Sequence, residues 1–304
     1  MVMELLQAKF FLCFGSVWFI YLAQGLTMPD IGTIRMITGR SPSPFDPTNV
    51  IQISWSPRAF LYKKFLSPEE CDHLITLAKD KMMKSKVADD ESGKAIDSEV
   101  RTSTGMFLSK AQDEIVEAIE DRLALWTFLP KENGEPIQIL HYENGQKYEP
   151  HLDFFHDKVN QKMGGHRIAT VLMYLSEVEK GGETIFPKSN IVQEKDESFS
   201  ECAKKGYAVK PEKGDALFFF SLQLDASTDA SSLHGSCPVI AGEKWSATKW
   251  IHVSNFEKVY ITVCADENDQ CVEWALRGEC EKNPVYMVGT DKVAGHCRKS
   301  CKVC

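Results

Sequence analysis

The sequence has no excess of positive charge, no Asn-X-Ser/Thr sequon, no His-Glu-X-X-His motif and no repeat of solenoid length. Its 35 basic and 43 acidic residues give a net charge of −8, which disfavours a nucleic-acid partner. The missing sequon predicts no N-glycosylation, and the missing histidine motif excludes the common helical zinc-protease site. With 43% hydrophobic and 26% charged residues, the composition is that of a globular chain rather than a disordered or multi-pass membrane protein.

Charge is also absent from one segment near the N-terminus. Residues 10–23 are 14 uncharged residues, which is short for a membrane span and typical of a secretory signal. Continued to Met28, the uncharged segment has 19 residues, enough for a signal anchor. We expect residues 1–28 to be a signal anchor or a cleaved signal peptide, and residues 29–50 to be a stalk. An anchor predicts a single-pass type II protein of the endoplasmic reticulum or Golgi membrane with the folded part in the lumen, whereas cleavage predicts a soluble lumenal protein.

Cysteine, by contrast, is abundant, and six of the ten cysteines lie in the last 41 residues. This density is typical of a small module held together by disulfides, which form in the oxidising secretory lumen. Six cysteines permit 15 pairings, so the spacing alone does not choose among them. A zinc ribbon is the alternative for this region.

Helix patterns come first in the central part of the chain. Residues 67–70 (SPEE) form a capping box with proline at the first helical position, and Cys71 is expected to be a small buried residue of that helix. Ser109 and Gln112 predict the start of a second helix, and residues 88–100 predict a polar loop between the two. The second helix should bury one face, made of Ile115, Ile119 and Leu123.

Strand patterns follow from Pro136 onward. Period-two alternation and β-branched runs, separated by glycine-containing turns, predict several strands. Helices followed by many strands favour a mainly β fold with flanking helices, a sandwich or jelly roll. The predicted strands are residues 137–142, 167–175, 183–186, 216–222 and 245–253.

Two histidines and an aspartate suggest a metal site. His151 and Asp153 are two residues apart, so on a strand their side chains point in the same direction. His234, 81 residues after Asp153, can complete a two-His, one-carboxylate site from another strand. Such a site suits non-haem Fe(II) and leaves positions open for a cosubstrate and O₂. Catalytic zinc accepts the same ligands and is the alternative.

Lys244 follows His234 by ten residues, at the start of the alternating stretch 244–252. A lysine that points into a barrel needs an anionic partner, because an unpaired buried ammonium group is costly. The distal carboxylate of 2-oxoglutarate is such a partner. A solvated surface lysine is the alternative.

Three segments resemble the catalytic domain of plant and algal prolyl 4-hydroxylases. They are ILHYENGQKYEPHLDFF at 139–155, RIATVLMYLSEVEKGGETIFP at 167–187 and residues 234–252. The resemblance covers about residues 51–256 and implies a double-stranded β-helix (jelly roll). It implies Fe(II) bound by His151, Asp153 and His234, and 2-oxoglutarate held by Lys244, Tyr142 and Thr184. It also implies contacts to the substrate peptide from Arg101, Ser103, Glu135, Tyr148, Arg167, Trp250 and His252. A core role for Trp250 and an ordinary surface role for Arg101 are the alternatives.

The resemblance implies an enzyme that converts peptidyl proline to 4-hydroxyproline in proline-rich, cell-wall-type secretory proteins. O₂ and 2-oxoglutarate would be consumed, succinate and CO₂ released, and ascorbate would reduce the iron after uncoupled turnovers. Another 2-oxoglutarate oxygenase, a zinc hydrolase and a non-catalytic secretory binding protein are the alternatives. The sequence predicts no oligomeric state.

The cysteine spacing of residues 264–304 resembles the ShK toxin-like domain, and the resemblance implies the pairs Cys264–Cys304, Cys271–Cys297 and Cys280–Cys301. Two further cysteines, Cys202 and Cys237, could pair with each other. Because Cys237 closely follows His234, that bridge would brace the strand that carries the metal ligand.

Overall fold

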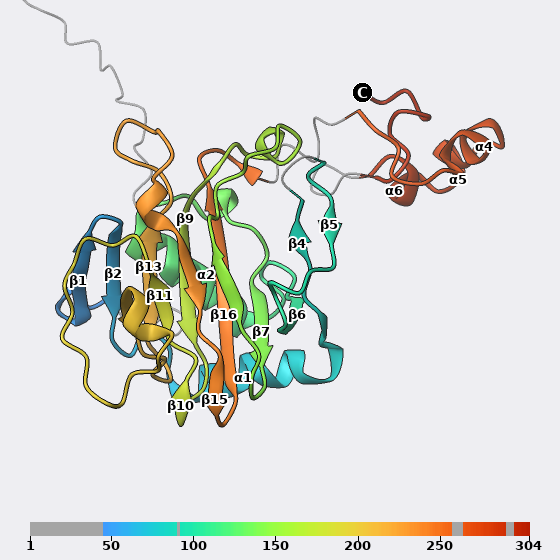
Figure 1. Ribbon diagram of the computed structural model, residues 1–304. Coiled ribbons are helices and arrows are strands. Elements are labelled where there is room, and N and C mark those ends of the chain that lie inside the picture. The colour runs from blue at the N-terminus through green and yellow to red at the C-terminus, as the bar shows by residue number, and fades with distance from the viewer. Residues whose placement is uncertain (1–44, 90–91, 257–263, 290–294) are drawn as a thin grey trace, which may run out of the picture. The chain divides into compact units, whose positions relative to one another are not determined.

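The computed structural model describes residues 45–89, 92–256, 264–289 and 295–304 (Figure 1). The expected signal segment and most of the expected stalk lie outside these residues. The end of the stalk prediction is wrong: Phe45 packs edge-on against Tyr62 with ring centroids 5.8 Å apart, and Val50 begins the first strand. Within the described part of the chain, no helix is both long enough and apolar enough to span a bilayer.

Two antiparallel sheets form the body of residues 45–256. The larger has eight strands in the order β1-β2-β13-β9-β16-β7-β6-β3, and the smaller has four in the order β12-β11-β14-β8. Two short pairs, β10 with β15 and β4 with β5, lie outside them. The strands are β1 Val50–Trp55, β2 Arg58–Tyr62, β3 Met83–Lys84, β4 Val87–Ala88, β5 Ala95–Ile96, β6 Thr104–Phe107, β7 Gln138–Tyr142, β8 Tyr148–His151, β9 Arg167–Tyr174, β10 Lys180–Gly181, β11 Thr184–Phe186, β12 Tyr207–Val209, β13 Ala216–Phe220, β14 His234–Ser236, β15 Val239–Ala241 and β16 Lys244–His252.

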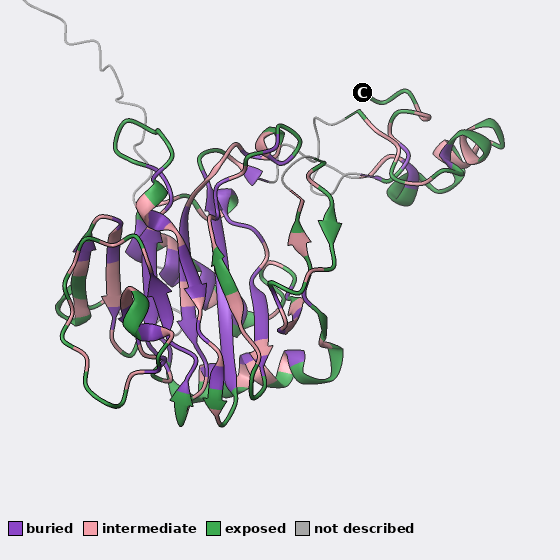
Figure 2. Ribbon diagram, viewed as in Figure 1, coloured by how far each residue is buried: buried purple, intermediate pink, exposed green. Residues whose placement is uncertain are grey.

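Each face of the large sheet is covered by different elements. On one face Val171, Ala247 and Ile251 pack with α1 (Pro68–Ala78) and α2 (Glu114–Thr127) in the main core. On the other face Leu217 and Phe219 pack with Phe186 and Val209 of the small sheet. Buried residues therefore run along both faces of the central strands (Figure 2). The predicted mainly β jelly roll with flanking helices is confirmed. Single 3-10 turns occur at Pro47–Asn49, Lys79–Lys81, Lys131–Asn133, Asn160–Lys162, Ala203–Lys205 and Ala230–Ser232.

The first helix begins as predicted, whereas the second does not. The Ser67 hydroxyl accepts a hydrogen bond from the Glu70 amide, and the Glu70 carboxylate accepts one from the Ser67 amide. The second helix begins at Glu114 because Asp113 is its N-cap, accepting from two amides of the first turn at 3.0 and 2.9 Å. Ser109 and Gln112 instead close a turn before the helix. The predicted inward face is confirmed at Ile119 and Leu123 and is wrong at Ile115, which is exposed in the first turn of the helix.

All five predicted strands are present, with ends that differ by at most two residues. The predicted loop at residues 88–100 contains part of a small hairpin, β4–β5, in its described residues. The sequence did not predict the short strands β8, β12 and β14 of the small sheet or the edge pair β1–β2.

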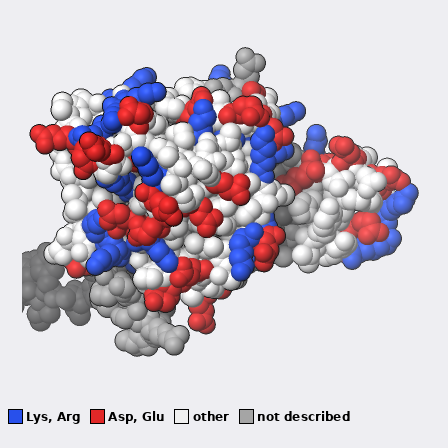
Figure 3. Space-filling model, turned by 60° about the horizontal axis from the view of Figure 1, so that its bottom comes forward, with Lys and Arg blue, Asp and Glu red and all other residues white. Residues whose placement is uncertain are grey.

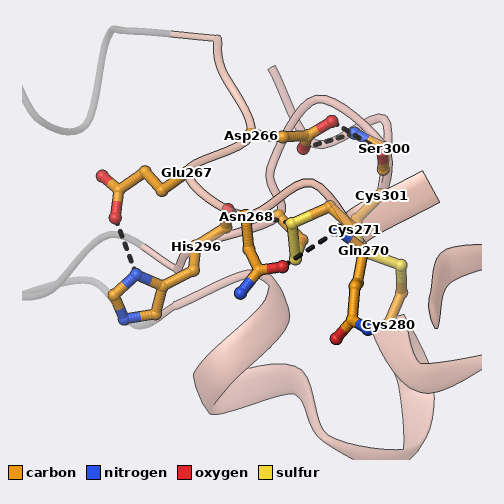
Figure 4. Close-up of a disulfide and its surroundings, with 10 residues drawn as sticks. Asp266, Glu267, Asn268, Gln270, Cys271, Cys280, His296, Ser300 and Cys301 are labelled. Carbon is orange, nitrogen blue, oxygen red and sulfur yellow. Dashed lines mark hydrogen bonds and ion pairs between the residues drawn. A yellow bond between two sulfur atoms is a disulfide. The ribbon is translucent and has the colours of Figure 1, made fainter. Parts of the chain in front are cut away.

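Residues 264–304 form their own small core around Cys271, Met287 and Cys297. The short helices are α4 Cys271–Leu276, α5 Glu279–Lys282 and α6 Pro284–Met287. The three disulfides are Cys264–Cys304, Cys271–Cys297 and Cys280–Cys301. Polar contacts add to them: Asp266 accepts from the amide and hydroxyl of Ser300, and His296 Nδ1 lies 2.6 Å from Glu267 Oε2 (Figure 4).

Candidate functional site

The small sheet brings two histidines face to face. His151 at the end of β8 is the direct partner of His234 at the start of β14. Asp153 follows β8, and the ligand atoms of the three side chains lie within 4.8 Å of one another. His151 Nε2 is 3.6 Å from Asp153 Oδ1, and His234 Nε2 is 3.6 Å from Asp153 Oδ2.

The hydrogen bonds of these residues fit a metal site. His151 Nδ1 lies 2.9 Å from the Glu149 carbonyl, and His234 Nδ1 lies 3.0 Å from the Ser232 carbonyl. Because a carbonyl only accepts, each Nδ1 is the protonated nitrogen, and each Nε2 keeps its lone pair for a metal. Thr170 donates to Asp153 Oδ2 at 2.5 Å and fixes that carboxylate. Two imidazoles and one carboxylate arranged in this way suit Fe(II).

Electrostatics keep His151 and Asp153 in the protonation states that bind a metal. Burial, and then the neighbouring His234, lower the pKa of His151 to about 3. Burial raises the pKa of Asp153, but the neighbouring His234, His151 and Arg167 and the hydrogen bond from Thr170 outweigh burial and lower the pKa to about 2. At neutral pH His151 is therefore neutral and Asp153 is ionised.

The three residues line a pocket that is open to solvent. Lys244 also lines it and is only 1% exposed, so the surface alternative for this lysine is wrong. Its Nζ donates to the Gly182 carbonyl at 2.7 Å and the Ser236 hydroxyl at 2.8 Å. Burial lowers the pKa of Lys244 to about 7, against the opposing influence of Glu183. This arrangement fits a carboxylate that enters the pocket and restores the full charge of the lysine.

Tyr142 and Thr184, the other residues expected to hold 2-oxoglutarate, line the same pocket. The Lys244 ammonium lies 5.3 Å from the centre of the Tyr142 ring. The Thr184 hydroxyl accepts a hydrogen bond from the Tyr174 hydroxyl at 2.9 Å. The structure therefore places Lys244, Tyr142 and Thr184 around one space.

Several polar residues of the pocket were missed from the sequence. Ser246 is 1% exposed, and its hydroxyl has no hydrogen-bond partner among the described residues. It lies two residues beyond Lys244 on the same face of β16, so strand alternation from Lys244 could have found it. No local pattern singled out the others, Thr170, Ser236 and Thr248.

Three of the residues expected to contact the peptide form a charged network beside this pocket. Arg167 donates two hydrogen bonds to Glu135, at 2.6 and 3.1 Å, and His252 Nε2 lies 2.8 Å from Glu135 Oε1. Burial raises the pKa of Glu135, but Arg167 and His252 outweigh burial and lower it to about 2. The Arg167 guanidinium lies 4.0 Å from the ring of Trp250, which itself lines the pocket.

The other three residues expected to contact the peptide, Tyr148, Arg101 and Ser103, lie outside this charged network. Tyr148 lines the pocket, whereas Arg101 and Ser103 do not. Arg101 is 4% exposed, so the surface alternative for it is wrong. Ser103 is fully buried, and its hydroxyl donates to Ser85. A disulfide joins Cys202 to Cys237, as the sequence suggested. Cys237 directly follows β14, the strand that begins with His234.

Comparison with known proteins identifies the family. Probable prolyl 4-hydroxylase 7 of Arabidopsis thaliana is 63% identical over 288 residues, which cover 93% of this chain and 91% of that protein. The chain belongs to the prolyl 4-hydroxylase family. Residues 137–252 match the 2OG-Fe(II) oxygenase superfamily, and residues 263–304 match the ShK domain-like family. Membership in the oxygenase superfamily favours Fe(II) and 2-oxoglutarate over the zinc-hydrolase alternative.

Two further family members from Arabidopsis thaliana are similarly close. Probable prolyl 4-hydroxylase 6 is 66% identical over 262 residues, covering 85% of this chain and 91% of that protein. Prolyl 4-hydroxylase 2 is 58% identical over 272 residues, which cover 87% of this chain and 91% of that protein. Among solved structures, the viral collagen prolyl hydroxylase vCPH from Paramecium Bursaria Chlorella virus-1, in its 2OG complex, is 26% identical with a TM-score of 0.48. The matched region covers 64% of this chain and 94% of the viral chain.

Proposed function

We propose that this protein is a prolyl 4-hydroxylase that converts peptidyl proline to 4-hydroxyproline. The reaction consumes O₂ and 2-oxoglutarate and releases succinate and CO₂. The observation that carries the proposal is the convergence of His151, Asp153, His234 and the buried Lys244 on one pocket in a chain of this family.

Bound Fe(II) would supply the activation of O₂, and the protein supplies position and a dry pocket. His151, Asp153 and His234 hold the metal, and Thr170 fixes the Asp153 carboxylate. Lys244, which is buried and lines the pocket, holds the distal carboxylate of 2-oxoglutarate. Trp250 lines the pocket beside the three proposed metal ligands and provides an aromatic surface on which a proline ring can pack.

The proposed substrates are proline-rich polypeptides of the secretory pathway, of the hydroxyproline-rich cell-wall type. The relatives named prolyl 4-hydroxylases support a prolyl substrate, whereas the cell-wall type of polypeptide rests on the family resemblance alone. Nucleic acid is disfavoured by the net charge of −8 and by the surface. On the face shown in Figure 3, the basic side chains of the described residues are interspersed with acidic ones.

The direct test is incubation of the purified protein with polyproline and collagen-like peptides, Fe(II), 2-oxoglutarate and ascorbate. The expected product is a peptide heavier by one oxygen atom, with the hydroxyl at C4 of proline by fragmentation and amino-acid analysis. Decarboxylation of 2-oxoglutarate without any peptide product would instead favour an oxygenase with another substrate. Omission of ascorbate should shorten the period of linear turnover.

The proposed location is the membrane of the endoplasmic reticulum or Golgi, with a type II anchor and a lumenal catalytic domain. The uncharged N-terminal segment supports entry into the secretory pathway, and the four disulfides require an oxidising compartment. N-terminal sequencing of the mature protein distinguishes an anchor from a cleaved signal peptide, which would leave a soluble lumenal enzyme.

We further propose that residues 51–256 and 264–304 are separate domains. The core of the second, around Cys271, Met287 and Cys297, is formed within it. Deletion of residues 257–304 is therefore expected to leave the catalytic domain folded, with a melting temperature within a few degrees of the full chain. Thermal unfolding followed by circular dichroism checks this. Aggregation of the truncated chain, or free thiols at Cys264 and Cys304 in secreted material, would contradict the separate module.

The affinity for 2-oxoglutarate should depend on pH through Lys244. Only the protonated lysine pairs with a carboxylate, and burial brings its pKa to about 7 in the absence of ligand. Below pH 7 the dissociation constant should be constant, and above pH 7 it should rise up to about tenfold per pH unit, because binding must then take up a proton. Anaerobic calorimetry in buffers of different ionisation enthalpy measures both effects. Lys244→Arg is the control, because its guanidinium stays charged and should remove the pH dependence.

A further inference from the structure

Of the two histidines proposed to bind the metal, His151 has less support from the hydrophobic core than His234. The ring of His234 packs against the core residue Phe219 at 4.5 Å, and its side chain is 10% exposed. His151 lies on β8, the outer strand of the small sheet, and its side chain is 23% exposed. Its closest ring neighbour is Tyr148, which is stacked on it with centroids 3.6 Å apart and planes at 17°.

Tyr148 is held in turn by Arg101. The guanidinium carbon of Arg101 lies 4.7 Å from the centre of the Tyr148 ring. Arg101 Nη2 donates to Gln138 Oε1 on β7 at 2.8 Å, and Nη1 donates to the Lys86 carbonyl at 3.1 Å. The bond to Gln138 anchors the guanidinium on the large sheet, and the bond to Lys86 ties it to the segment between β3 and β4, although the Tyr148 ring that it covers belongs to the small sheet.

The backbone around Arg101 supports the same strand. Arg101 and Tyr148 form an antiparallel bridge. The Glu149 amide donates to the Val100 carbonyl at 2.8 Å, and the Thr102 amide donates to the Lys147 carbonyl at 3.0 Å. Residues 100–102 therefore cover the edge of β8 that β14 does not pair, and they fix this strand at the point where it carries His151.

We propose that Arg101 and Tyr148 are positioning residues for the metal ligand His151. The hydrogen bond from Nδ1 to the Glu149 carbonyl fixes one edge of the imidazole, and the stacked Tyr148 ring prevents the imidazole from swinging away about that hydrogen bond. Arg101 keeps Tyr148 in place through its contacts on β7. This inference rests on the proposed metal site and assigns these residues a role other than the peptide contacts that the family resemblance implies.

The test compares pairs of variants by their affinity for metal. Tyr148→Leu removes the stacked ring and Tyr148→Phe keeps it, whereas Arg101→Met removes the guanidinium and keeps the aliphatic stem. Anaerobic calorimetric titration with Fe(II), without peptide, should show an affinity about tenfold weaker in Tyr148→Leu and about 3- to 10-fold weaker in Arg101→Met. Tyr148→Phe should stay within about twofold of the wild type. Visible absorption of bound Co(II) should change in Tyr148→Leu and not in Tyr148→Phe.

Arg58→Met is the matched control. Arg58 also lies over an aromatic ring, that of Phe220 at 4.0 Å, and donates to a carbonyl, that of Leu222 at 2.8 Å, but Phe220 does not line the pocket, whereas Tyr148 does. Arg58→Met should therefore leave metal affinity unchanged even where it lowers thermal stability. If Tyr148→Leu does not fold, Arg101→Met decides the question.

Unchanged Fe(II) affinity in the variants that fold, together with a raised Michaelis constant for the peptide, would overturn the inference in favour of direct peptide contacts. Failure of the proposed function has a different signature: the wild-type protein would bind Fe(II) but hydroxylate no proline peptide. Metal affinity would still report the positioning role in that case.

Discussion

Replacement of His234 by alanine is expected to abolish proline hydroxylation while the protein remains folded. Removal of one ligand from a site with three protein ligands leaves a metal that is weakly bound and poorly oriented. Loss of a residue that only supports a ligand already costs about 10- to 100-fold in affinity or activity, and a ligand itself should cost more. The measurement is peptide hydroxylation at saturating 2-oxoglutarate, together with an anaerobic Fe(II) titration.

His73→Ala is the control for this variant. His73 lies on α1, where it contacts Asp113 at 2.8 Å, and it does not line the pocket. The same substitution there should leave turnover and Fe(II) affinity unchanged. Retained hydroxylation in His234→Ala would show that the metal has a different set of ligands, and Asp157, close to Asp153 in sequence, would be the first residue to examine.

The large sheet could be predicted from the sequence because its central strands are long. β9 and β16 have eight and nine residues, so several periods of a regular pattern are visible between turn residues. The strands β8 and β14 have four and three residues, too few to show a period. Their pairing joins parts of the chain more than 80 residues apart and depends on the packing of the small sheet.

The same difference applies to the site. The spacing of His151 and Asp153 is local, so it could be recognised in the sequence. That His234 lies directly opposite His151 is a property of the small sheet. The role of Thr170 could not be predicted, because its contact with Asp153 joins β9 of the large sheet to the segment after β8, and a threonine in a strand is ordinary. The start of α2 was predicted wrongly because two local caps compete, and Asp113, which accepts from two amides of the first turn, prevails over the Ser109–Gln112 turn.

Lys244→Ala is expected to raise the Michaelis constant for 2-oxoglutarate sharply and to leave Fe(II) affinity close to that of the wild type. The lysine is 1% exposed and donates to Gly182 and Ser236, so its removal leaves the cosubstrate carboxylate in a pocket without a counter-charge. Loss of one partner of a buried charge pair costs roughly 2–5 kcal/mol, or about 30- to 5000-fold in affinity. Lys244→Arg should recover part of this loss, because the longer planar guanidinium does not fit a site shaped for an ammonium group.

Lys249→Met separates this effect from a general loss of stability. Lys249 lies on the same strand but is in the buried ion pair with Glu120, at 2.6 Å, and does not line the pocket. Its replacement leaves the buried Glu120 carboxylate without its cationic partner. This should lower the free energy of unfolding by roughly 3–5 kcal/mol, with little change in the Michaelis constant for 2-oxoglutarate. A 2-oxoglutarate titration of the three variants at fixed Fe(II) and peptide, with urea unfolding in parallel, measures both quantities. β16 presents Lys244 to the pocket and Lys249 to the helices on its opposite face, so the two substitutions affect different surroundings. An unchanged Michaelis constant for 2-oxoglutarate in Lys244→Ala would therefore mean that the distal carboxylate binds elsewhere than at Lys244.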